Sequence, residues 1–139
     1  MNPAQVLEEI SGALHGTKAT RNDIKFLKTS LPKNLMPNWL VLLLSEYNLA
    51  GSAFSLDRKE DQSGLGAEVI WLLPIQLVSE AYDSEPGISV RSLGFVAIGA
   101  CATGSGDPYF LDMRMASNDP PVVRVPHDCR SRRLSIGQN

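Results

Sequence analysis

The segment that most constrains the fold is an apolar run that stops at a glycine-rich turn and then resumes as an alternating run. Residues 95–102 (FVAIGACA) are apolar throughout, as in a strand buried on both faces. Residues 103–108 (TGSGDP) are rich in residues that favour turns. From Tyr109 onwards apolar and polar side chains alternate, which predicts a half-buried strand with Asp112 on its polar face. The sequence therefore predicts two antiparallel strands joined by a hairpin that displays Asp107 to solvent.

The same turn lacks the residues that nucleotide binding or acyl transfer would need. A dinucleotide-binding loop has a third glycine and then a helix, but Tyr109 occupies that position and a strand follows. A nucleophile turn has glycines two residues before and after its serine, where Ser105 has Thr103 and Asp107. The two histidines and two cysteines of the chain show no metal-ligand spacing. We therefore predict a protein that is not an enzyme and holds no metal or cofactor.

Periodicity along the rest of the chain predicts helices before most of the strands. Thr20 followed by Asp23 resembles a capping box, with Ile24, Phe26 and Leu27 facing inward. The very apolar segment after Pro37 is expected to form the central helix of the core, with Leu42 widening its apolar stripe. This order of elements predicts an α+β fold. Helices are expected at 2–16, 20–29, 37–48 and 74–82, and strands at 53–56, 68–73, 95–102, 109–115 and 122–125.

Charge is distributed unevenly along the 139 residues, although the net charge is only −2. Residues 56–119 hold ten acidic and four basic side chains, a net charge of −6, whereas residues 1–55 carry +1 and residues 120–139 carry +3. An acidic surface disfavours nucleic acid and favours a basic protein partner through electrostatic steering. We therefore expect a protein partner and no nucleic acid.

The length fits one domain, and nothing in the chain predicts a membrane segment. The N-terminus lacks a basic segment followed by an apolar one, as a secretory signal would have. The longest aliphatic run, residues 40–44, is far shorter than the ~20 apolar residues that span a bilayer. The two cysteines form neither a C-x-x-C motif nor a disulfide framework. We expect a cytoplasmic protein that does not bind membranes.

Short motifs along residues 20–128 resemble, in order and spacing, those of the SUKH superfamily, also called the Smi/Knr family. The first half of the resemblance is the helix of the type "LP…fl…yN.aG", and the second half is a hairpin of the type "IG..GsGD.y.lD" that leads into a "pV" strand and a "hD" pair. The matching residues are Leu31-Pro32, Trp39-Leu40, Tyr47-Asn48, Ala50-Gly51, Trp71-Leu72, Ile98-Gly99, Gly104-Ser105-Gly106-Asp107, Tyr109, Leu111-Asp112, Pro121-Val122-Val123 and His127-Asp128.

The resemblance implies a single domain over residues 1–128, followed by a polar tail over residues 129–139. Its fold would be α+β, with N-terminal helices packed on a mixed, mostly antiparallel, bent sheet. The family is not known for catalysis. Many bacterial members are immunity proteins that bind and neutralise a toxin domain, often a nuclease or deaminase, whereas eukaryotic relatives are regulatory interaction proteins in cell-wall signalling.

Together these observations predict a non-catalytic binding module, most specifically an immunity protein for a basic toxin domain. A regulatory scaffold with an endogenous partner and a small enzyme of unrecognised type are the alternatives. The candidate partner-binding residues are mainly acids of the middle segment and its hairpins: Asp107, Tyr109, Asp112, Glu68, Asp57, Glu60 and Asp61.

Overall fold

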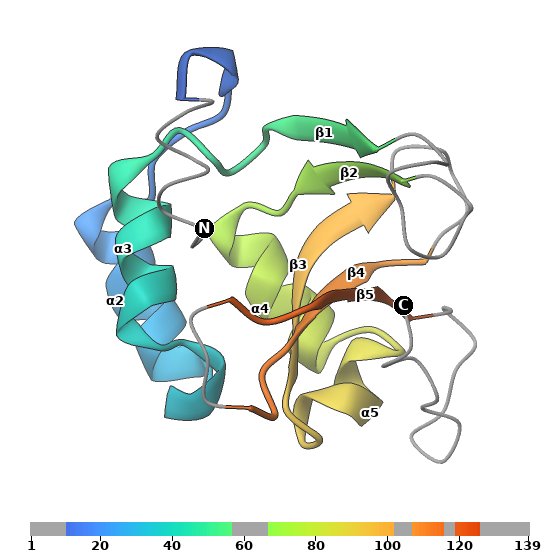
Figure 1. Cartoon of the computed structure of the whole chain (residues 1–139). Coiled ribbons are helices and arrows are strands. Elements are labelled where there is room, and N and C mark those ends of the chain that lie inside the picture. Colours follow the sequence, from blue (N-terminus) through green and yellow to red (C-terminus); the bar gives the residue numbers. More distant parts are fainter. Residues whose placement is uncertain (1–10, 57–66, 102–106, 116–118, 126–139) are drawn as a thin grey trace.

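The computed structural model describes residues 11–56, 67–101, 107–115 and 119–125. Five strands form one sheet in the order β1-β2-β3-β4-β5, and every neighbouring pair is antiparallel. Figure 1 shows α2 and α3 together at one end of this sheet. The predicted α+β class is confirmed. The elements are η1 (Ser11–Ala13), α2 (Arg21–Ser30), η2 (Lys33–Leu35), α3 (Asn38–Glu46), β1 (Ala53–Leu56), β2 (Ala67–Trp71), α4 (Pro74–Tyr82), α5 (Gly87–Arg91), β3 (Phe95–Cys101), β4 (Tyr109–Asp112) and β5 (Val122–Arg124).

The capping box predicted at the start of α2 is present. The Thr20 hydroxyl accepts a hydrogen bond from the Asp23 N–H at 3.1 Å, and the Asp23 carboxylate accepts one from the Thr20 N–H at 2.8 Å. Both bonds satisfy N–H groups that a helix start leaves unpaired. Leu27 is fully buried, but Phe26 is 41% exposed, so the prediction that Phe26 faces inward is wrong. Of the helix predicted at 2–16, residues 2–10 lie outside the described residues, and residues 11–13 form the 3₁₀ turn η1.

The very apolar helix α3 buries one face rather than its whole circumference. Leu40, Leu43 and Leu44 are buried, whereas Leu42 points away from them and is 54% exposed. The prediction that Leu42 extends the buried stripe is therefore wrong. The helices packed closely against β3 are α4 and α5, whereas α3 packs beside α2, so α3 is not the central helix that the sequence predicted.

The second helical region is longer than the sequence predicted. Pro74 begins α4 as expected, and its fixed φ suits the first helical turn. Residues 83–87 were expected to end the helical region, but Gly87 begins a further short helix, α5. The backbone of Gly87 lies against the carbonyl of Glu80, where any Cβ would collide, which allows α5 to fold back on α4.

The hairpin predicted from residues 94–113 is confirmed in its strands, because β3 and β4 are antiparallel neighbours. Its turn, residues 102–106, lies outside the described residues. A register shift between Ala97 and Gly99 forms a bulge, and a Cβ on Gly99 would collide with Cγ1 of Val69 on β2. All four residues of β4 are buried, so the prediction of a half-buried strand is wrong.

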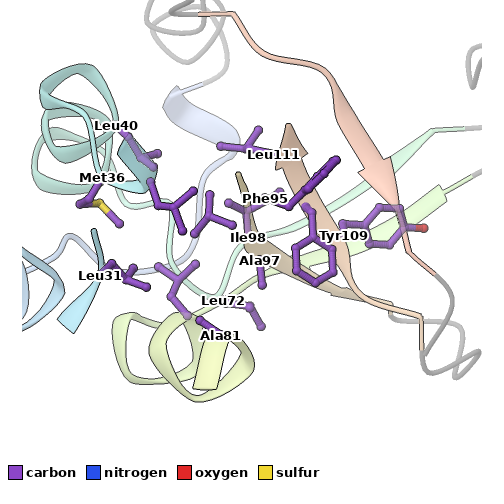
Figure 2. Close-up of a cluster of buried hydrophobic side chains, with 14 of the residues drawn as sticks. Leu31, Met36, Leu40, Leu72, Ala81, Phe95, Ala97, Ile98, Tyr109 and Leu111 are labelled. Carbon is purple, nitrogen blue, oxygen red and sulfur yellow. The ribbon is translucent and has the colours of Figure 1, made fainter. Parts of the chain in front are cut away.

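One hydrophobic core joins the helices to β3, β4 and β5. Figure 2 shows Met36 and Leu40, from the α3 side, and Ala81, from α4, directed toward Ala97 and Ile98 of β3. Burial along β3 and β4 includes residues of both strand faces. Along β1 and β2, in contrast, every second side chain is exposed: Ala53, Ser55, Glu68 and Ile70.

Candidate functional site

The structure separates the predicted partner-binding residues into three groups. Glu68 is exposed on β2, and Asp107 is half-buried just before β4. Tyr109 and Asp112 are buried, with 4% and 7% of their surface exposed. Asp57, Glu60 and Asp61 lie outside the described residues.

Asp112 is a structural residue at the end of β4. Its carboxylate accepts three hydrogen bonds from Arg114: from Nε at 2.8 Å, from Nη2 at 2.7 Å and from the backbone N–H at 3.1 Å. The hydrogen bonds from this guanidinium hold the pKa of Asp112 below its usual range, and Asp112 raises the pKa of Arg114. The guanidinium also lies 4.9 Å from the centre of the Phe95 ring. The prediction that Asp112 stands on an exposed polar face is wrong, because Arg114 satisfies the carboxylate and allows its burial.

Tyr109 belongs to the core and to a cross-strand pair. It pairs with Gly99 of β3 on one side and with Arg124 of β5 on the other. The Arg124 guanidinium lies 5.2 Å from the centre of the Tyr109 ring. Since these contacts enclose the ring, Tyr109 offers almost no surface for a partner.

Glu68 and Asp107 lie at the same end of the sheet. Val69, next to Glu68, pairs with Cys101 at the end of β3. Extending the register by two residues beyond the Gly99–Tyr109 pair brings Asp107 beside Cys101. Because directly opposed residues share a face, this register places Asp107 on the face of Val69, opposite to that of Glu68. Leu56 ends β1 and Ala67 begins β2 at this same end.

A continuous exposed surface extends from Glu68 along the first two strands. Ala53 pairs with Ile70 and Ser55 pairs with Glu68, so these four side chains share one face, which we call the outer face. Ile70 is 39% exposed on this face, and Leu73, which follows β2, is exposed to the same extent near Gly51. The outer face therefore combines the Glu68 carboxylate with the partly exposed apolar side chain of Ile70.

A buried serine anchors this half of the molecule. The Ser52 hydroxyl donates to the Asn48 carbonyl at 2.8 Å and accepts the backbone N–H groups of Gly16 at 3.0 Å and His15 at 3.2 Å. The His15 ring also bonds locally: Nε2 accepts the Ala53 N–H at 3.4 Å, and Nδ1 lies 3.3 Å from the Ala13 carbonyl oxygen. Both side chains therefore form their hydrogen bonds with the backbone. The hydroxyl proton of Ser52 points at a carbonyl rather than at a base. Sequence analysis missed this cluster because His15 and Ser52 stand 37 residues apart.

One acid outside the predicted set has a perturbed pKa. Glu80, on α4, is half-buried, and this burial raises the pKa of its carboxyl. It lies on the helical layer and not on the outer face. The shift therefore reflects packing and marks no second site.

The part of the chain that the structure describes also bears on metal binding and on membrane insertion. Within it, His, Cys, Asp and Glu side chains form no group of three or more that could hold a metal ion. None of the helices described is sufficiently long and apolar to cross a membrane.

Comparison of the chain with protein-family models, curated proteins and solved structures finds no match. The SUKH resemblance therefore stays a prediction from the quoted motifs.

Proposed function

We propose that this chain is a non-catalytic, cytosolic protein-binding module, most specifically an immunity protein that binds and neutralises a bacterial toxin domain such as a nuclease or deaminase. The observation that carries the proposal is the outer face, where Glu68 and Ile70 are exposed on the same side of β2. The motifs that resemble the SUKH superfamily support the toxin-directed form of the proposal.

The composition of the outer face suits recognition of a basic protein. Protein interfaces obtain much of their binding energy from a few apolar anchors, and Ile70 supplies one on this face. Glu68 supplies negative charge that speeds encounter with a positively charged partner. Nuclease domains bind a polyanion and are commonly basic, so their charge complements this face.

The first experiment is to purify the tagged protein from the cells that encode it and to identify what accompanies it at stoichiometric yield. A basic toxin domain whose activity is inhibited by the purified protein supports the proposal. A different cellular protein overturns the immunity assignment in favour of a regulatory scaffold. The absence of any stoichiometric partner contradicts the binding module altogether.

Charge reversal then tests the face itself. We expect Glu68→Lys to weaken binding to the identified toxin domain about tenfold or more, because it replaces an attraction with a repulsion. Glu46→Lys, which changes another exposed acid, on α3, is the matched control and should leave affinity within about twofold. Equal effects of the two variants, measured by calorimetric titration, would place the interface elsewhere.

A further inference from the structure

Helix α2 carries a row of positive charges on its solvent side. Arg21, Lys25 and Lys28 are all exposed and follow one another at spacings of four and three residues, which brings them onto one face of a helix. We call these three residues the basic stripe. At 1.5 Å per residue the stripe is about 10 Å long.

Within the described residues, no acidic side chain forms an ion pair with the basic stripe. Asp23 is the one acid on the helix, and its carboxylate is bonded to the Thr20 N–H in the capping box. The ion pair found within the described residues joins Asp112, the last residue of β4, to Arg114, which lies beyond that strand. The three cations therefore face solvent without a counter-charge from the described part of the chain.

The arrangement also opposes the stability of the helix. Arg21 is the first residue of α2, where the helix dipole favours an anion. Arg21 and Lys25, and then Lys25 and Lys28, are like charges at spacings at which side chains repel each other. Lys28, in the last turn, is the one member that the dipole favours. Because these charges weaken their own helix, we attribute their presence to binding rather than to folding.

The basic stripe lies away from the outer face. In Figure 1, α2 is at one end of the molecule, whereas β1 ends and β2 begins at the other. Glu68 is the second residue of β2. The basic stripe is thus a second surface, opposite in charge to the outer face, which is the surface proposed to bind the toxin domain.

From this placement we propose that the basic stripe docks an acidic protein segment with carboxylates at matching spacing. Its short length and the chain's net charge of −2 suit a few carboxylates better than a long polyanion such as nucleic acid. The basic stripe also lacks an aromatic side chain on which a base could stack. Phe26 lies on another flank of α2, the one that carries Ser30. The Ser30 carbonyl accepts a hydrogen bond from Tyr82 of α4. This inference does not rest on the toxin-directed function.

The test uses the full chain, a labelled peptide of twelve glutamates and a twelve-nucleotide oligothymidylate, compared by fluorescence anisotropy at low ionic strength. We expect the glutamate peptide to bind more tightly than the oligonucleotide. The combined variant Arg21→Gln, Lys25→Gln, Lys28→Gln should weaken peptide binding at least tenfold, whereas Lys18→Gln with Lys33→Gln should change it less than threefold. Tighter binding of the oligonucleotide, or equal loss in both variants, overturns the proposal.

Thermal unfolding supplies an independent readout. Since the stripe opposes helix stability, the triple variant should melt at the same temperature as the wild type or higher. A clearly lower melting temperature would show that the three cations stabilise the fold, and would also overturn the proposal.

Discussion

The two halves of the sheet differ in what their residues do. Along β3 and β4 side chains of both strand faces are buried, and the buried acid Asp112 is paired with the exposed Arg114. Along β1 and β2 one face packs inward through Val69 and Trp71, while the outer face stays exposed. The same backbone architecture therefore provides stability in one half and an accessible surface in the other. Four predictions test this division.

The largest expected difference is between one large apolar residue in each half. Phe110 on β4 is 1% exposed, and Phe110→Ala should lower the free energy of unfolding by about 3–5 kcal/mol, because it leaves a cavity in the core. Ile70→Ala on the outer face should cost less than about 1 kcal/mol, since Ile70 is 39% exposed. Urea unfolding of both variants measures the contrast. Similar losses would mean that the outer face is part of the core.

The next prediction concerns two serines near β1. Ser52→Ala removes a buried hydroxyl that makes three hydrogen bonds with the backbone, so we expect a loss of about 1–3 kcal/mol in the free energy of unfolding. Ser55→Ala, on the outer face, should change stability by less than about 0.5 kcal/mol. If Ser52→Ala proves neutral in thermal unfolding, this cluster does not anchor the N-terminal segment.

A third substitution tests the boundary between β2 and β3, where the two halves of the sheet meet. Gly99→Ala places a Cβ against Val69 of β2, and overpacking of this kind lowers stability by about 1–3 kcal/mol. Gly12→Ala is the control, because nothing lies within 4 Å of a Cβ there. Urea unfolding should separate the two, and a tolerated Gly99→Ala would show that β2 can shift relative to β3.

The smallest expected effect is a change in pH dependence. Arg114 lowers the pKa of Asp112 in the folded protein. The ion pair therefore adds stability above the ordinary Asp pKa of about 4, and this is lost as the pH falls through the lower, folded value. Asp112→Asn should flatten the acid limb of the stability curve. Thermal unfolding between pH 7 and pH 2 measures it, and an unchanged limb would contradict a stabilising role for the pair.

Local signals predicted much of this fold. Thr20 and Asp23 fixed the start of α2, and the turn-rich residues 103–108 predicted the β3–β4 pairing. Two features were not predicted from the sequence. Asp112 looked exposed because an acid on an alternating strand usually is, and Arg114 reverses that expectation. Helix α5 is too short to show periodicity.

Less of the candidate site than of the fold could be predicted from the sequence. Alternation along β2 identifies Glu68 as exposed, because its neighbour Val69 packs inward. Its grouping with Asp107 requires the register of three strands, which the sequence does not contain. The summed charge of residues 1–55 is only +1 and does not reveal the cations of α2, which gather on one face only through their helical spacing.

The position of β3 has a consequence for synthesis. It is the middle strand of the sheet, yet it begins only at Phe95, long after the leucines of α3. At ~5–20 residues per second, roughly 3–10 s pass on the ribosome between Leu44 and Phe95. Throughout that interval α3 can pack on α2 but not on β3, so the core that holds Leu40 and Leu43 cannot be completed until β3 has been made.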